Sequence, residues 1–237
     1  MIHQSKRILF VVTSTETIGP KNRPSGYEFS EVAHPYLVFT ANGHRVDFAS
    51  IKGGRPPEDG FNSEDPASVI FRESTGFNDL NESKRLDQIV LDLYDAVFFP
   101  GGLGPMDDML HDPIVKKTVA HFYETDRVVG AVCHGPAALL NVSISDGTKL
   151  LDGKRVAAFT TAEEIGHSEH DVPFMLDAEM EKQGAIHSFA DPFAKHVVID
   201  GLLITGRNPA SAVGVAQEMA SSMNGQQSNR NLHVFAS

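Results

Sequence analysis

The sequence predicts an α/β protein, a three-layer α/β/α sandwich in which helices cover both faces of a mostly parallel sheet. Short apolar runs rich in β-branched residues alternate along the chain with longer segments of helical period. Parallel strands that are buried on both faces are typically continuous apolar runs of this kind. One run also stops abruptly at Cys133, and open α/β sheets bind their ligands beyond the carboxyl ends of such strands.

The predicted strands are short and apolar, as in the opening run RILFVV and the run VVGAV that precedes Cys133. The last two strands are separated by Asp200-Gly201, a dipeptide that favours a tight turn. Together the predicted strands cover residues 7–12, 45–49, 96–99, 128–132, 156–159, 196–200 and 202–205.

Segments of helical period lie between these strands. Asn42-Gly43 ends the first helix and Gly184 a later one, because these residues adopt the left-handed conformation found at helix ends. The predicted helices cover residues 30–41, 82–91, 113–125, 134–140, 174–183 and 208–222.

Two segments fall outside this alternation. Residues 50–81 contain several glycines and prolines among charged residues, and we expect an excursion with little regular structure of its own. We expect residues 224–237 to form a loose tail. Because the sequence has neither an internal repeat nor a long linker, we expect residues 1–237 to form a single domain.

Composition excludes several classes of function. The 237 residues carry a formal net charge of −11, which argues against nucleic-acid binding because phosphate contacts need clustered Lys and Arg. No apolar run approaches the ~20 residues that span a bilayer. The N-terminal apolar run is followed at once by polar residues, unlike a secretory signal. With one cysteine, no internal disulfide is possible, and we expect a cytoplasmic protein.

The segment VVGAVCHGPAALL predicts a nucleophile elbow at Cys133. A strand ends, one reactive residue follows, and a helix with small residues begins. Small neighbours such as Ala131, Gly135 and Ala137 give room for this sharp turn. A helix N-terminus would stabilise the thiolate, the nucleophilic form. The alternative is a buried structural cysteine, but the Cys-His-Gly-Pro context favours a functional one.

Several tracts together resemble a known family. They are AVCHGPAAL, FFPGGLGPMDD, GYEFSEVAHPY, FTTAEE, VPFMLDAEMEKQGA and ITGRNPASA. Over about residues 7–218 the chain resembles the ThiJ/PfpI superfamily, which has a class I glutamine amidotransferase-like, flavodoxin-like fold. The similarity is closest to the branch of heat-shock-type chaperones and glutathione-independent glyoxalases (glyoxalase III).

The resemblance implies catalytic roles for four residues. It assigns the Cys-His pair to Cys133 and His134. Since adjacent residues on a regular helix do not face each other, His134 reaches the sulfur only through an irregular elbow; otherwise it orients or relays protons. The triad acid is Glu164, with Glu163 as the rival. The buried glutamate beside the sulfur is Glu31, for which the alternative is a solvated helix face. Glu28 is its neighbour and rival.

The tract FPGGLG is expected to form the other wall of the site. The resemblance implies an oxyanion hole made by the backbone N–H groups of Gly102 and His134. Many relatives in this branch carry His after the two glycines, whereas this chain has Leu103, which puts substrate contacts in doubt. In TGRNPASA we expect Asn208 to cap the last helix.

We expect no metal site and no cofactor. The i, i+3 pair His167 and His170 has metal-ligand spacing, but no third ligand is evident in the sequence. By resemblance the partners are a small 2-oxoaldehyde substrate and a second copy in a homodimer.

The function implied by the resemblance is a glyoxalase III-like conversion of methylglyoxal or a related 2-oxoaldehyde to a 2-hydroxy acid, through a covalent Cys133 adduct. A different class is a stress-response holding chaperone for misfolded clients or a Cys-based redox sensor. A further alternative is a protein deglycase, amidase or peptidase. True glutamine amidotransferases pair the cysteine with a distant His, whereas here His134 is adjacent.

Overall fold

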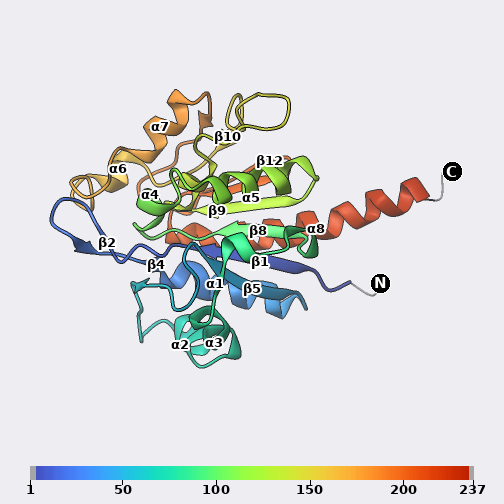
Figure 1. Cartoon of the computed structure of the whole chain (residues 1–237), viewed down its shortest axis with the longest axis horizontal. Coiled ribbons are helices and arrows are strands. Elements are labelled where there is room, and N and C mark those ends of the chain that lie inside the picture. The colour runs from blue at the N-terminus through green and yellow to red at the C-terminus, as the bar shows by residue number, and fades with distance from the viewer. Residues whose placement is uncertain (1–3, 235–237) are drawn as a thin grey trace.

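The computed structural model describes residues 4–234, and a seven-stranded sheet lies at its centre (Figure 1). The strand order is β12-β13-β9-β8-β1-β5-β7, and every neighbouring pair is parallel except β12 and β13. The five consecutive parallel strands from β5 to β13 follow the flavodoxin-like order. The strands are β1 (Arg7–Val12), β5 (Arg45–Ser50), β7 (Lys84–Arg85), β8 (Ala96–Phe99), β9 (Val128–Val132), β12 (Val197–Asp200) and β13 (Leu203–Gly206). This confirms the predicted fold class.

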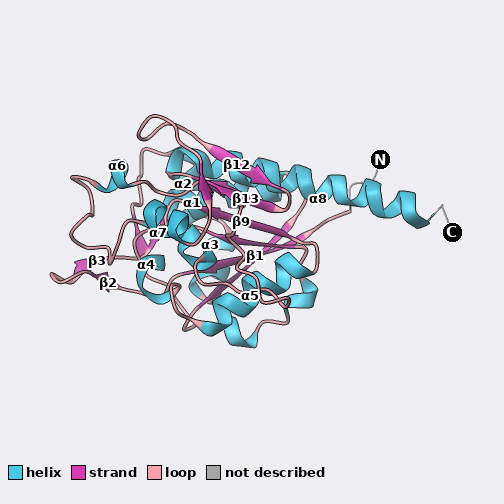
Figure 2. Ribbon diagram, turned by 90° about the horizontal axis from the view of Figure 1, so that it is seen from above, coloured by secondary structure: helices cyan, strands magenta, loops and turns pink. Residues whose placement is uncertain are grey.

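The central strands are buried on both faces because helices cover both. Helix α5 (Pro113–Glu124) packs on one face, and α1 (Phe29–Ala41) with α8 (Ala212–Val234) packs on the other (Figures 1 and 2). Alternate side chains of each strand point to opposite faces, so the sheet divides the core into two apolar clusters. The continuous apolar pattern of the sequence is the direct consequence.

Smaller elements surround the sheet (Figure 2). Among them are two short helices, α4 (Pro105–Asp108) and α6 (Thr161–Glu164), and one longer helix, α7 (Leu176–Lys182). Three two-stranded sheets complete the set: β2 (Thr17–Ile18) with β3 (Arg23–Pro24), β4 (Tyr27–Glu28) with β6 (Glu58–Asp59), and β10 (Arg155–Val156) with β11 (Ile186–His187). Several of these elements, among them α4, α6 and β2 with β3, lie near the carboxyl ends of the strands of the central sheet (Figure 2).

The prediction of little regular structure in residues 50–81 is wrong. Besides β6, this segment contains α2 (Pro66–Arg72) and α3 (Thr75–Asn81). The side chains of Asp65 and Ser74 accept hydrogen bonds from the first N–H groups of these helices, as N-cap residues do. Phe71 and Leu80 are fully buried, so apolar packing fixes both helices.

The helix predicted at residues 82–91 is also wrong. Residues Lys84–Arg85 form β7 at the edge of the sheet, followed by the short 3₁₀ helices η1 (Leu86–Gln88) and η2 (Leu91–Leu93). Helix α3 has already ended at Asn81, and pairing of Lys84 with Ala49 extends the sheet instead. Sheet pairing here outweighs the local helical pattern.

Two predicted elements near the site are shorter or tighter than expected. The strand predicted at 156–159 ends at Val156, because the N–H groups of Ala157 and Ala158 donate to the side chains of Thr205 and His187. The helix predicted at 134–140 is a 3₁₀ helix, η3 (Gly135–Leu139). The half-buried Lys116 binds the carbonyl oxygens of Ala137 and Ala138 through its ammonium group.

The predicted loose tail is helical over most of its length. Helix α8 begins at Ala212, after the 3₁₀ helix η4 (Pro209–Ser211), and continues to Val234 beyond the body of the protein (Figure 1). The sequence after Ser222 contains no proline to stop it. Residues 235–237 of the predicted tail lie outside the described residues. Within residues 4–234, no helix is both long and apolar enough to cross a membrane.

Candidate active site

Cys133 occupies a sharp turn between β9 and η3. Its φ angle is +61°, a left-handed conformation that non-glycine residues rarely adopt and that costs free energy. Two backbone hydrogen bonds hold the turn: the Cys133 N–H donates to Gly206 O, and the Phe159 N–H donates to Cys133 O, each over 2.9 Å. The predicted elbow is therefore present, and hydrogen bonds to two neighbouring segments hold its strained backbone conformation.

The irregular turn brings His134 back to the sulfur. Its Nδ1 lies 3.4 Å from Cys133 Sγ, and its Nε2 lies 2.5 Å from Glu164 Oε1. Phe159 packs against the imidazole, with 4.6 Å between ring centroids. Because a carboxylate accepts the Nε2 proton, Nδ1 is left with a lone pair that faces the thiol. The three residues form a continuous chain of hydrogen-bonding groups.

Glu164 and Glu163 are both buried, but they point to different partners. Thr160 caps helix α6 in a capping box with Glu163, whose side chain turns back to the Thr160 N–H. Glu164 instead reaches His134, and its second oxygen accepts the Ser168 hydroxyl. Burial alone would raise the pKa of Glu164, but the hydrogen bonds from His134 and Ser168 outweigh it and lower that pKa. Of the two candidates, Glu164 is the one beside His134.

Glu31 lies in the first turn of α1, fully buried on the other side of the sulfur. Its Oε2 accepts the Gly101 N–H over 2.6 Å. Its Oε1 has no hydrogen-bond partner of normal geometry among the described residues. Burial, and then the nearby charge of Glu28, raises the pKa of Glu31 to about 8, while the Gly101 N–H and the Cys133 thiol oppose the rise. Glu31 is therefore mainly protonated at neutral pH.

The expected stabilisation of the Cys133 thiolate by a helix N-terminus is not found. Burial, and next the charge and hydrogen bonding of Glu31, raises the pKa of Cys133 well above its ordinary value; the Gly102 N–H opposes this. The segment after Cys133 is a five-residue 3₁₀ helix, too short to supply the dipole of a full α-helix. Burial and the Glu31 carboxyl group thus both favour the thiol over the thiolate at Cys133.

Two glycines allow the loop after β8 to approach the sulfur. A Cβ on Gly101 would lie 2.7 Å from both Cys133 Cβ and Glu31 Oε2. Gly102 has a φ of +88°, and a Cβ there would lie 2.2 Å from Gly26 O. No other residue fits either position without displacing backbone. The loop thereby brings the Gly102 N–H to the sulfur, as its effect on the Cys133 pKa requires.

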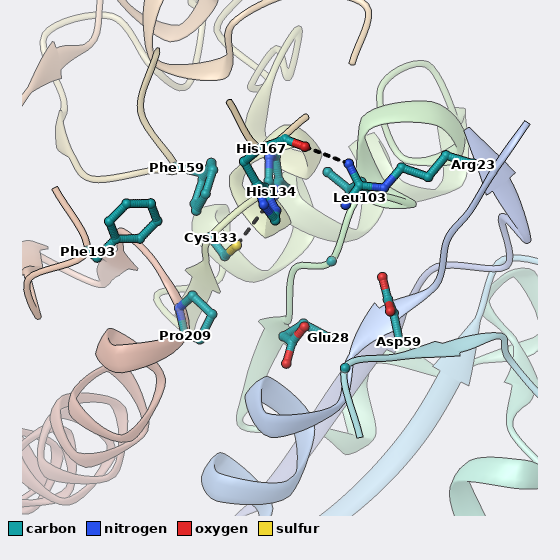
Figure 3. A pocket seen from close by; sticks show the side chains of 12 residues that line it. Arg23, Glu28, Asp59, Leu103, Cys133, His134, Phe159, His167, Phe193 and Pro209 are labelled. Atoms are coloured by element: carbon teal, nitrogen blue, oxygen red, sulfur yellow. Dashed lines mark hydrogen bonds between the residues drawn. The ribbon is translucent and has the colours of Figure 1, made fainter. Parts of the chain in front are cut away.

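A cavity of about 370 Å³ opens directly over the sulfur (Figure 3). Gly102, Leu103, Cys133 and His134 line it, so the predicted oxyanion residues and the predicted nucleophile face one space. Glu31 does not line the cavity, since its side chain is fully buried behind the sulfur. The remaining lining residues are Arg23, Glu28, Asp59, Gly60, Phe159, His167, Phe193 and Pro209.

The tract after β13 serves a different purpose from the one expected. Asn208 precedes η4, and Pro209 is its first residue, but the Asn208 side chain makes no capping hydrogen bond. Its amide instead donates to Glu163 Oε1 over 2.8 Å. The Arg207 side chain, which is 2% exposed, donates to Glu163 Oε2 over 2.9 Å. Asn208 and Arg207 therefore bind the buried carboxylate of Glu163 instead of capping the start of the helix.

The HSEH tract contributes two residues to the site, Ser168 and His167. Ser168 holds Glu164, while His167 lines the cavity and its carbonyl oxygen accepts a hydrogen bond from Arg23. Among residues 4–234, no group of three or more His, Cys, Asp or Glu side chains could hold a metal ion.

Sequence reasoning missed Ser168, Arg23, Asp59 and Phe193. They lie in loops and two-residue strands that approach the elbow from distant parts of the chain. Phe159 was within reach of sequence reasoning, because it immediately precedes the Thr160-to-Glu164 tract.

The fold and the site together define a family. Residues 24–222 match the DJ-1/PfpI family, and the chain belongs to it. The resemblance to ThiJ/PfpI proteins is thereby confirmed.

Individual relatives are similar over almost their whole length. Glyoxalase 3 of Candida albicans is 28% identical over 90% of this chain and 96% of its own. The crystal structure of glyoxalase III from Candida albicans matches with a TM-score of 0.83 at 28% identity, covering 92% of this chain and 97% of that one. The Rapid Encystment Protein 24 KDa of Francisella tularensis matches with a TM-score of 0.88 at 33% identity, covering 92% and 99%.

Proposed function

We propose that this protein is a glutathione-independent glyoxalase that converts methylglyoxal or a related 2-oxoaldehyde to a 2-hydroxy acid. One observation carries the proposal: the Cys133 sulfur opens into a cavity, with His134 and Glu164 on one side and the buried carboxyl group of Glu31 on the other. Similar proteins are named glyoxalases, which favours this reaction among those open to a cysteine nucleophile.

In the first step the sulfur adds to the aldehyde carbon. His134 Nδ1, 3.4 Å from the sulfur, takes the thiol proton, and the ionised Glu164 stabilises the resulting imidazolium. The aldehyde oxygen becomes an alkoxide that the N–H groups of Gly102 and His134 stabilise. It then takes the proton back from His134, giving a hemithioacetal. Cys133 performs covalently what a glutathione thiol would do in solution.

In the second step His134 moves a proton between two carbons. It removes the hydrogen from the former aldehyde carbon, giving an enediolate, and the hydroxyl proton passes between the two adjacent oxygens. His134 then returns its proton to the second carbon, which leaves a thioester of the 2-hydroxy acid. Water, deprotonated by His134, attacks the thioester; the acid departs and the sulfur regains a proton. The net reaction adds one water to the 2-oxoaldehyde and needs no oxidant.

Glu31 acts on the sulfur rather than on the substrate, since it does not line the cavity. Its pKa of about 8 keeps the carboxyl group protonated at neutral pH. A neutral carboxyl group donates a hydrogen bond to the thiolate as it forms and leaves, whereas an ionised one would repel it. The free oxygen Oε1 of Glu31 is available for this exchange.

The test is the turnover of methylglyoxal by purified protein in the absence of glutathione, with lactate identified as product. We expect lactate to form in equal amount to the methylglyoxal consumed. Protection of an aggregating client protein is measured in the same preparation. Protection that survives Cys133→Ser, without any lactate formation by the wild type, would replace this proposal with a holding function.

A redox-sensing role for Cys133 is less favoured. Sensor cysteines are exposed and have low pKa values. Here the Cys133 thiol is 5% exposed, and burial beside Glu31 raises its pKa.

A further inference from the structure

One wall of the cavity is apolar and lies beside the sulfur. It consists of Phe159, Phe193 and Pro209, which we call the apolar wall (Figure 3). The opposite side carries charged residues, Arg23, Glu28 and Asp59. A substrate attached to Cys133 therefore has one apolar surface next to it and one charged surface across the cavity.

Phe193 has two unusual properties for an aromatic residue. Its side chain is 63% exposed, and its φ angle is +60°. Exposure forfeits the free energy that burial of a phenyl ring provides, and a bulky residue with positive φ is strained. Strain of this kind persists where the surrounding structure enforces it, and it clusters at functional sites.

The enforcing group is the buried carboxylate of Glu163. Its Oε1 accepts the Phe193 N–H over 2.8 Å and the Asn208 amide over 2.8 Å. Its Oε2 accepts the Thr160 N–H and hydroxyl group and the Arg207 guanidinium group. Arg207 also binds the carbonyl oxygens of residues 190 and 191, just before Phe193.

The same carboxylate thus fixes all three members of the apolar wall. Phe193 donates to Glu163 directly, Phe159 precedes the donor Thr160, and Pro209 follows the donor Asn208. Three segments from distant parts of the chain converge on one buried anion. The result is a preorganised apolar surface beside the nucleophile, and preorganisation lowers the entropic cost of binding.

The size of the cavity favours a ligand larger than methylglyoxal. At about 370 Å³, it falls within the range of about 300–1,000 Å³ that is typical of sites for drug-sized ligands. Methylglyoxal carries only a methyl group beyond its two carbonyls, too little to fill a cavity of this size.

We propose that Phe193 is a specificity-determining residue and that the apolar wall receives an aryl substituent of the 2-oxoaldehyde. The preferred substrate class is then an arylglyoxal, with its ring between Phe193 and Pro209 and its aldehyde carbon at the Cys133 sulfur. That this site carries out the glyoxalase reaction rests on the proposed function. That the substrate carries an aryl substituent rests on the apolar wall.

The first test compares kcat/KM for phenylglyoxal and methylglyoxal. We expect the wild type to favour phenylglyoxal. We expect Phe193→Ala to lower the ratio of kcat/KM for phenylglyoxal to that for methylglyoxal by about tenfold, the scale of one lost aromatic contact. Phe189 is the matched control, because it lies on the same loop, is 69% exposed and does not line the cavity. Phe189→Ala leaves the ratio unchanged. A wild-type preference for methylglyoxal, or an unchanged ratio in Phe193→Ala, overturns the proposal.

A second test separates the apolar wall from the reaction. Phenylpropanedione has an aryl group and two carbonyls but no aldehyde hydrogen, so the reaction cannot be completed on it. Calorimetry on the Cys133→Ser variant measures its binding without adduct formation. We expect Phe193→Ala in that background to weaken binding by about tenfold, and Phe189→Ala to have no effect. Such binding without turnover of either aldehyde supports the apolar wall and refutes the proposed glyoxalase; equal binding by all three variants refutes the apolar wall.

Discussion

His134 and Glu164 share a hydrogen bond of 2.5 Å between Nε2 and Oε1, although 30 positions separate them in the sequence. This bond fixes the imidazole tautomer and leaves Nδ1 free to accept the Cys133 proton. Ser168 supports the carboxylate from its other oxygen. In the proposed reaction, the ability of His134 to act as a base therefore depends on a residue that does not contact the sulfur.

Glu164→Gln is expected to lower kcat by about 10²–10⁴-fold, because an amide neither stabilises the imidazolium nor enforces the tautomer. Steady-state kinetics with methylglyoxal measure the effect, and circular dichroism checks the fold. A variant with wild-type kcat would show that Glu164 has no part in the reaction.

The neighbouring residue Glu163 is expected to behave differently. Glu163→Ala leaves the buried Arg207 without its ionic partner, and breaking a buried ion pair costs about 3–5 kcal/mol. Urea denaturation measures the free energy of unfolding, with Glu164→Gln as the comparison. A loss below about 1 kcal/mol would mean that the Glu163–Arg207 pair does not stabilise the fold.

Glu31 should give the reaction a basic pH limit. Because its pKa is raised to about 8 and the protonated form is required, kcat should fall as the pH rises through about 8. Glu31→Gln cannot titrate, so this limb should disappear, and the rate should be lower by about 10²–10⁴-fold.

The control for Glu31 is Glu64→Gln, which changes an exposed glutamate far from the sulfur in sequence; its pH profile should match the wild type. If Glu31→Gln keeps the basic limb, the group that limits the reaction lies elsewhere.

Glu28 should tune the reactivity of the thiol through its charge. Glu28 raises the pKa of both Glu31 and Cys133, so Glu28→Gln should lower both. The protein has a single cysteine, and alkylation by iodoacetamide therefore reports on Cys133 alone. The pH at which alkylation accelerates should decrease in Glu28→Gln and stay constant in Glu64→Gln. A higher pH for this acceleration in Glu28→Gln would contradict the effect assigned to the charge of Glu28.

The predictions from the sequence are most accurate where one continuous segment determines the structure. The strand at residues 128–132 and the turn at Cys133 follow from local pattern, and the structure contains both. The choice between Glu163 and Glu164 also had a local signal, since Thr160 and Glu163 have capping-box spacing. A glutamate that turns back to cap its own helix is not free to reach His134.

The missed features depend on tertiary structure. The raised pKa of Cys133 follows from burial and from Glu31, which lies 102 positions earlier in the chain. Phe193 joins the site because Glu163 holds its backbone, and no sequence pattern indicates this. The helices within residues 50–81 did carry signals, Asp65-Pro66 and Ser74, which were outweighed in the prediction by the glycines and prolines around them.

The proposed reaction requires the Cys133 sulfur as its nucleophile. Its test is the kcat/KM of Cys133→Ala for methylglyoxal, measured beside the wild type and with lactate as the product. We expect a loss of about 10³-fold or more, with the fold retained. Turnover within about tenfold of the wild type would contradict a covalent thiol mechanism.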